Sequence, residues 1–100
     1  MKQEKWKSLL GLANRAGKIA SGEEQVLKEI RKRKAKLVIL AGDASENTAK
    51  KFQDKCSYYQ IPLKTAPDRF SLGSALGKPE RVVVAVLDEG FANGLMAFLN

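Results

Sequence analysis

The chain has 100 residues, the size of one domain with one core, and 44% of them are hydrophobic, as in an ordinary globular protein. Lys and Arg number 18 against 11 Asp and Glu, and the net charge of +7 favours a nucleic acid or an acidic membrane surface as partner. Histidine is absent and Cys56 is the only cysteine, which argues against a zinc site, an internal disulfide and histidine-based catalysis.

The N-terminal third of the chain predicts two helices separated by a short extended segment. Residues 2–16 place apolar side chains at helical spacing, and Gly17 stands where that helix would end. Residues 18–20 are expected to be extended. The second helix is expected over residues 21–33, with an apolar stripe formed by Val26, Leu27 and Ile30.

The second predicted helix opens with two adjacent acids, which is unexpected in so basic a chain. Its first residues are Ser21, Gly22, Glu23 and Glu24. This spacing predicts a capping box, in which Ser21 caps the helix and Glu24 reaches back to the backbone N–H of Ser21. Acids in a first turn also suit the helix dipole, so the pair needs no ligand and argues against a bare phosphate site at this helix end.

The middle of the chain predicts a strand, a helix and a second strand. The apolar residues of 35–41 run together without alternation, as in a strand covered on both faces. Residues 42–45 are expected to turn into a third helix, one side of which carries Thr48, Phe52, Cys56 and Tyr59. Pro62 ends that helix, and residues 63–66 form a short strand.

The C-terminal third predicts a turn, a brief helix, a strand and a last helix. Pro67 and Asp68 turn the chain, and the brief helix spans residues 71–76. The second strongly apolar strand spans residues 81–87. Asp88 is expected to cap the last helix, whose buried side carries Phe91, Leu95, Phe98 and Leu99.

The alternation of these elements determines the expected fold class. Strands and helices alternate along the whole chain, which favours a single α/β domain over residues 1–100, with helices on both faces of the sheet. The two fully apolar strands are expected to be central and the short strands to lie at the edges.

Two further groups of residues bear on chemistry and location. Cys56 is expected to be a small buried apolar residue, and Trp6, Tyr58 and Tyr59 are expected to pack, since they are not interleaved with basic residues. No apolar run is long enough to span a membrane, and residues 1–18 lack the apolar core of a signal peptide. The sequence therefore predicts a cytoplasmic protein.

The outer face of the second predicted helix is the main candidate binding surface. Opposite its apolar stripe lie Glu24, Gln25, Lys28 and Lys32, whose polar groups can bond base edges and phosphates. A solvated helix face explains the same pattern without any ligand. If the face binds RNA, Lys18, Lys28, Lys32 and the basic run at residues 31–36 would supply the phosphate contacts.

Four segments of the chain are distinctive: Gly17-Lys18, SGEEQVLKEIRKRKAKLVILAGDAS, IPLKTAPDRFSLGSALG and the closing valine-rich strand. Together they resemble the ribosomal-protein family that binds kink-turn RNA, which includes archaeal L7Ae and eukaryotic L30e. The likeness covers essentially the whole chain and is greatest to the small bacterial members known as YlxQ. It implies a three-layer α/β/α sandwich around a mixed four-stranded sheet of order 1-4-2-3, with the last strand antiparallel to the others.

The resemblance also implies which residues of the second helix contact RNA. In the family a Gly-x-Asn-Glu-x-x-Lys motif, or a Lys-Gln variant in bacterial members, reads the sheared G·A pairs of the kink-turn. The matching residues here are Gly22, Glu24, Gln25 and Lys28. Gly22 would let the backbone approach RNA, Gln25 would offer its amide to guanine, and Lys28 would reach a base or phosphate. Glu24 departs from the family pattern, because members carry Asn or Lys there.

A second contact is implied in the loop after the third strand, which packs on flipped-out bases in the family. Here this loop is Ala66-Pro67-Asp68-Arg69, with Ala66 and Pro67 as an apolar surface and Arg69 as a charge. Pro67 and Asp68 also make an ordinary turn by themselves. Residues 42–45 are expected near the same end of the molecule.

The function expected from these features is non-enzymatic binding of structured, kink-turn-like RNA by a monomer without metal or cofactor, with ribosomal RNA as a candidate partner and no membrane partner. The alternative is a protein-interaction module of the same fold that has lost kink-turn specificity, and Glu24 is its main support. An RNA-modifying enzyme is the third hypothesis. The chain has no Gly-x-Gly-x-x-Gly loop, P-loop or nucleophile elbow to support it.

Overall fold

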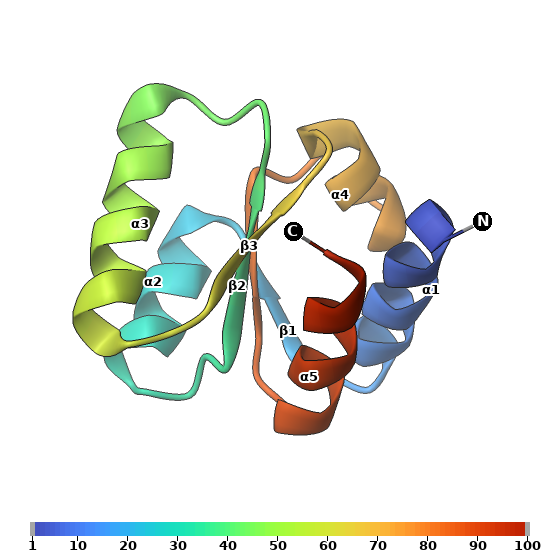
Figure 1. Cartoon of the computed structure of the whole chain (residues 1–100), viewed down its shortest axis with the longest axis horizontal. Coiled ribbons are helices and arrows are strands. Elements are labelled where there is room, and N and C mark those ends of the chain that lie inside the picture. Colours follow the sequence, from blue (N-terminus) through green and yellow to red (C-terminus); the bar gives the residue numbers. More distant parts are fainter. Residues whose placement is uncertain (1, 100) are drawn as a thin grey trace.

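The structure is a computed structural model that describes the backbone of residues 2–99 and the side chains of residues 5–99. Its elements alternate along the chain, as predicted (Figure 1). They are α1 (Lys2–Arg15), β1 (Ile19–Ser21), α2 (Glu23–Arg31), β2 (Leu37–Ala41), α3 (Glu46–Tyr59), β3 (Leu63–Ala66), α4 (Arg69–Ala75), β4 (Val83–Val86) and α5 (Glu89–Phe98).

One mixed sheet organises these elements. Its strand order is β1-β4-β2-β3, and β4 runs antiparallel to both β1 and β2, whereas β2 and β3 are parallel. The order and directions implied by the family resemblance are therefore confirmed. Every residue of β2 and β4 is buried, because these central strands are covered on both faces, and the short strands β1 and β3 form the edges.

Helices cover both faces of the sheet and give the expected three layers (Figure 1). On one face, α1, α4 and α5 pack against Leu37, Ile39 and Val84. On the other face, α2 and α3 pack against residues of the same strands that point the opposite way, such as Val38 and Ala85. The alternation of side chains along each strand thus divides one apolar run between two cores.

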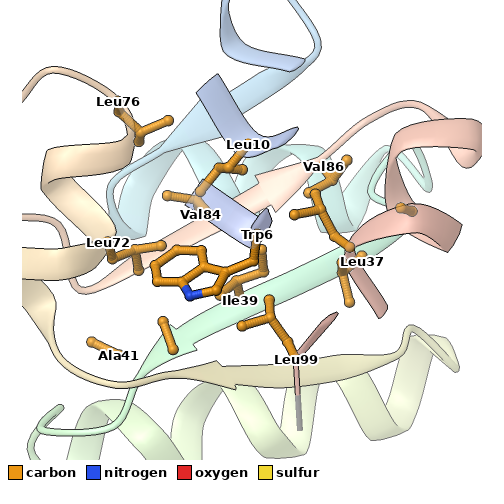
Figure 2. Packing of buried hydrophobic residues seen from close by; sticks show 13 residues of the cluster. Trp6, Leu10, Leu37, Ile39, Ala41, Leu72, Leu76, Val84, Val86 and Leu99 are labelled. Carbon is orange, nitrogen blue, oxygen red and sulfur yellow. The ribbon is translucent and has the colours of Figure 1, made fainter. Parts of the chain in front are cut away.

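Trp6 belongs to the core under α1, α4 and α5, which confirms its predicted packing role. Its side chain is only 2% exposed, and Figure 2 shows the indole ring among Leu72, Ile39 and Leu99. Burying a large apolar side chain of this kind stabilises a fold by about 1.5–3 kcal/mol. Trp6 therefore anchors α1 to the sheet.

Polar caps determine where three of the helices begin. The side chains of Ser45, Asp68 and Asp88 each accept a hydrogen bond from the backbone N–H of the third residue onward. The predicted cap at Asp88 is confirmed. Because Asp68 caps α4, this helix begins at Arg69, two residues earlier than the sequence predicted.

In the part of the chain that the structure describes, no helix has the length and apolar character needed to cross a membrane. Residues 5–99 also hold no group of three or more His, Cys, Asp or Glu side chains arranged to bind a metal ion.

Candidate nucleic-acid interface

Three strands of the sheet have their carboxyl ends on the same side of the molecule. This row of strand ends, which is distinct from the edge strands β1 and β3, is here called the carboxyl edge. Strands β1, β2 and β3 run in the same direction (Figure 1). Gly22, Gly42 and Pro67 each follow one of these strands, so all three lie at this edge. The N–H of Gly42 donates to the carbonyl of Ala66 at 2.8 Å, which holds the loops after β2 and β3 together. Strand β1 lies three strand spacings from β3, or about 14 Å.

Gly22 makes the sharp change of direction between β1 and α2. Its φ of 93° and ψ of 152° lie in a region that essentially only glycine adopts. Its N–H donates to the carbonyl of Val83 at 3.0 Å, and its carbonyl accepts from the N–H of Val26 at 3.0 Å. Gly22 is therefore fixed from both sides, and a Cβ added there would meet no atom within 4 Å, so its surroundings are open.

The face of α2 that the sequence predicted to be polar is exposed in the structure. Glu24, Gln25 and Lys28 all reach solvent, whereas Val26 and Ile30 are buried. Gln25 and Lys28 are three residues apart and are neighbours on the helix surface. One partner surface can therefore meet both side chains.

The predicted capping box at Ser21 is wrong. Ser21 is the last residue of β1, where it pairs with Val84, and Gly22 takes the N-cap position of α2 without a side-chain hydrogen bond. The Ser21 hydroxyl instead accepts a hydrogen bond from Nε of Arg81 at 3.4 Å. Sheet pairing holds Ser21 extended and one residue too early to cap the helix.

The two adjacent acids of α2 have different surroundings. Glu23 forms an ion pair with Lys51 at 2.9 Å and accepts a hydrogen bond from the Thr48 hydroxyl at 3.4 Å, which links α2 to α3. Glu24 extends from the exposed face and has no hydrogen bond or ion pair among the described residues. Both carboxylates lie near the positive end of the helix dipole, which favours them there.

The structure corrects the expected apolar surface of the loop after β3. Ala66 is the last residue of β3 and is only 1% exposed, so its methyl group belongs to the core. Pro67 is exposed, as predicted. The Asp68 carboxylate accepts a hydrogen bond from the Ser71 N–H at 2.7 Å, and this bond lowers the pKa of Asp68 below its ordinary value. Asp68 therefore has a structural role as the cap of α4.

Arg69 joins the loops of the carboxyl edge to one another. Its Nε lies 3.3 Å from the Asp43 carboxylate, its guanidinium donates to the Asp43 carbonyl at 2.8 Å, and its backbone N–H donates to the same carboxylate at 2.9 Å. A longer ion pair of 3.7 Å joins Arg69 to Glu80. The charge of Arg69 is therefore largely neutralised by acids of the protein itself, whereas the sequence predicted a charge available to RNA.

Two residues at this edge were not predicted from the sequence. Phe70 lies in the first turn of α4 and is 61% exposed, which places a large apolar ring close in sequence to Pro67. Arg81 precedes β4 and connects the two candidate segments, because its backbone N–H donates to the Arg69 carbonyl at 3.0 Å and its Nε donates to Ser21. The sequence did carry a signal for Phe70, because a large apolar residue in the turn before the predicted helix has no helix face on which to be buried.

The basic residues predicted to contact phosphates do not gather at the carboxyl edge. Lys18 precedes β1, and its carbonyl accepts from the N–H of Leu87, which follows β4. Lys32 is the C-cap of α2, and the N–H of Lys36 donates to Val86, the last residue of β4. These cations therefore lie toward the opposite edge of the sheet, and of the predicted phosphate contacts only Lys28 lies within one turn of Gln25.

Cys56 and the tyrosines were all expected to be packing groups. Cys56 is 3% exposed, and burial raises the pKa of its thiol to about 11, in agreement with the prediction of a buried apolar residue. Tyr58 is 78% exposed, so the prediction is wrong for this residue. Position 58 faces solvent because Cys56 and Tyr59 already take the buried side of α3.

The chain is similar in sequence and in fold to known proteins. The chain is 59% identical over 95 residues to "RNA-binding protein YlxQ" of Bacillus subtilis, with 95% of each chain covered. It is 35% identical over 97 residues to "Large ribosomal subunit protein eL30" of Yarrowia lipolytica, covering 91% of this chain and 85% of that protein. A solved structure of a Bacillus halodurans protein of unknown function has a TM-score of 0.91 at 52% identity, covering 94% of this chain and 95% of that one.

The family model described as "Ribosomal protein L7Ae/L30e/S12e/Gadd45 family" matches residues 4–96. This match and the relatives above cover nearly the whole chain, including α2 and the loops of the carboxyl edge. The chain therefore belongs to the ribosomal protein L7Ae/L30e/S12e/Gadd45 family.

Proposed function

We propose that this protein binds structured RNA containing a kink-turn, without catalysing a reaction, through the start of α2 and the loop after β3. Family membership supports RNA as the partner, since the relatives are named as an RNA-binding protein and a large ribosomal subunit protein. Ribosomal RNA is the first candidate target.

The observation that carries this proposal is the shared position of two exposed surfaces of different chemistry. The polar face of α2 begins at Gly22, and the exposed Pro67 and Phe70 flank the start of α4 at the same edge of the sheet. The strands from which they emerge are about 14 Å apart, which is comparable to the width of the grooves of a nucleic acid duplex. One folded RNA can therefore contact both.

Each surface suits a different part of a bent RNA. Gln25 has an amide that can donate to and accept from base edges, and Lys28 adds a charge beside it. The open space at Gly22 allows RNA to approach the backbone. Pro67 and Phe70 provide apolar surface on which unpaired bases can stack. Paired bases would therefore meet α2, and flipped-out bases would meet the loop.

Glu24 opposes binding in this arrangement. Its carboxylate is exposed beside Gln25 and has no cation of the described chain as a partner. A negative charge there repels RNA phosphates, although it can accept a hydrogen bond from a base amino group. Glu24→Asn removes this charge and restores the residue type of the family motif, so it is expected to tighten binding to a standard kink-turn.

The test is a titration of the wild type and its variants against one kink-turn RNA and one plain duplex. Gln25→Ala and Lys28→Ala are each expected to weaken kink-turn binding by about 1–3 kcal/mol, with little effect on the duplex. Lys78→Gln serves as the control for charge, because Lys78 is exposed and lies beyond α4. Circular dichroism melting of each variant separates lost binding from lost folding.

The same titration tests the alternative, a protein-interaction module that has lost kink-turn specificity. Glu24 is the residue that favours this alternative. If the wild type, Gln25→Ala, Lys28→Ala and Glu24→Asn all bind both RNAs with one weak affinity, the proposal fails and α2 presents a solvated face to RNA. The protein-interaction function then becomes the better explanation.

A further inference from the structure

A second surface with nucleic-acid chemistry lies at the edge of the sheet opposite the carboxyl edge. Strands β2 and β3 are parallel, and they begin after Lys36 and Pro62 and end before Gly42 and Pro67. The two edges are therefore separated by the length of β3, or about 13 Å for four residues. The residues of this basic-aromatic surface are Arg33, Lys34, Lys36, Lys55, Tyr58 and Tyr59.

The aromatic part of this surface comes from the last turn of α3. The rings of Tyr58 and Tyr59 meet edge to face, with centroids 5.0 Å apart and an interplanar angle of 77°. Tyr59 is partly buried and packs on the core, whereas Tyr58 is 78% exposed. Tyr59 therefore holds Tyr58 in place, and Tyr58 presents a ring to solvent.

The basic part comes from the segment that follows α2. Arg33 has a φ of 60°, and this turn places its guanidinium 5.0 Å from the centre of the Tyr59 ring. Between residues 31 and 36 the chain carries five exposed cations and no acid, and none of these cations pairs with a carboxylate of the described residues. Cations without a carboxylate partner, close to the exposed ring of Tyr58, favour an anionic ligand that also has flat surfaces.

Two hollows flank Tyr59 and give the surface its shape. One, of about 290 Å³, is lined by Arg33, Lys36 and Pro62 among others. The other, of about 340 Å³, is lined by Asp54, Lys55 and the two tyrosines. Asp54 is the acid of this second hollow, and its charge is countered by Lys50 at 3.4 Å. Each hollow thus combines an aromatic wall with at least one cation.

We infer that this surface binds an unpaired stretch of RNA, with a base stacked on Tyr58 and phosphates held by Arg33, Lys36 and their neighbours. Sequence-tolerant binding of single strands uses this combination of a basic surface and exposed rings. An acidic protein would satisfy the cations but has no need of the exposed ring. The inference relies on the proposed function only in taking RNA as the polyanion, and it assigns the protein a second RNA segment beyond the kink-turn.

The test measures binding of two labelled RNAs by fluorescence anisotropy. The probes are a twelve-nucleotide oligoadenylate and a kink-turn duplex without overhangs. Tyr58→Ala is expected to weaken oligoadenylate binding about fivefold or more and to leave kink-turn binding unchanged. Tyr58→Phe keeps the ring and is expected to bind like the wild type. Because Tyr58 is largely exposed, Tyr58→Phe should not change the melting temperature, and Tyr58→Ala should lower it only by the loss of the edge-to-face contact with Tyr59.

Matched controls separate the two surfaces and the two kinds of contact. Phe70→Ala removes an exposed ring at the carboxyl edge, so it should weaken kink-turn binding and spare the oligoadenylate. Lys36→Gln should weaken the oligoadenylate more than Lys78→Gln does, although each removes one exposed charge.

The outcomes also distinguish this inference from the proposed function. Equal oligoadenylate binding by wild type and Tyr58→Ala, or equal losses in Lys36→Gln and Lys78→Gln, would overturn the inference, since binding would then reflect net charge alone. Competition by polyglutamate that is as strong as by oligoadenylate would also overturn it, in favour of an acidic protein partner. If the wild type binds the oligoadenylate but does not bind the kink-turn RNA, the result would count against the proposed function and would still support the second surface.

Discussion

Replacing Gly22 by Ala isolates the backbone conformation on which the candidate interface depends. A side chain at φ 93° and ψ 152° costs about 1–3 kcal/mol, and the lower entropy of the unfolded alanine chain returns about 0.4–1 kcal/mol of this. The N–H of Gly22 donates to the carbonyl of Val83, and its carbonyl accepts from the N–H of Val26. The backbone therefore cannot relieve the strain at residue 22 without disturbing these hydrogen bonds. We expect a net loss of about 1–2 kcal/mol in the free energy of unfolding, or about 4–16 °C in Tm.

Urea denaturation and RNA titration of the same samples check this expectation. A Cβ added at Gly22 has no atom within 4 Å, so the loss should arise from backbone strain without a steric clash. Gly77→Ala is the matched control, because Gly77 also has a positive φ, 71°, and open surroundings, but it follows α4. It should destabilise the fold without specifically weakening kink-turn binding.

Two results would refute the reasoning about Gly22. If Gly22→Ala has the same Tm and free energy of unfolding as the wild type, the backbone does not adopt this glycine-specific conformation at the start of α2. If the variant is destabilised but binds the kink-turn as tightly as wild type under folding conditions, the RNA does not depend on the geometry of this turn.

Three further predictions test other parts of the structure. Ser45→Ala is expected to cost about 0.5–2 kcal/mol of stability, and Ser21→Ala clearly less, because only Ser45 caps a helix; equal losses in denaturation experiments would contradict this. Arg69→Ala should cost about 1 kcal/mol, and the loss measured by urea denaturation should shrink at high salt, since its ion pairs are partly exposed; a loss independent of salt would count against an electrostatic role. Because burial raises the pKa of Cys56 from 9.0 to about 11, the unfolded chain loses this proton first. The contribution of Cys56 to stability should therefore be constant below pH 9 and fall by at most about 1.4 kcal/mol per pH unit between pH 9 and 11; a Cys56→Ala variant with the same pH dependence would refute this.

The local sequence determined the elements and layers of this protein. The unbroken apolar runs around Leu37 and Val84 predicted strands buried on both faces, and both strands are central. Helical spacing likewise predicted the buried Val26 and the exposed Gln25 of α2. These features follow from the sequence because burial of alternate or periodic side chains depends on neighbours only a few residues away. The strand order came from the family resemblance, since no local pattern encodes pairing between distant strands.

The tertiary structure alone decided which residues share a surface. Ser21 fits a capping box in sequence, yet its pairing with Val84 places it in a strand and leaves the cap to Gly22. Arg69 follows Asp68 in sequence, but Asp68 caps α4, and the close packing of two loops pairs Arg69 with Asp43, 26 residues away. The basic run after α2 lies at the opposite edge from Pro67 because strand direction determines the end at which each loop emerges. Such contacts join segments far apart in the chain, so only the folded sheet specifies them.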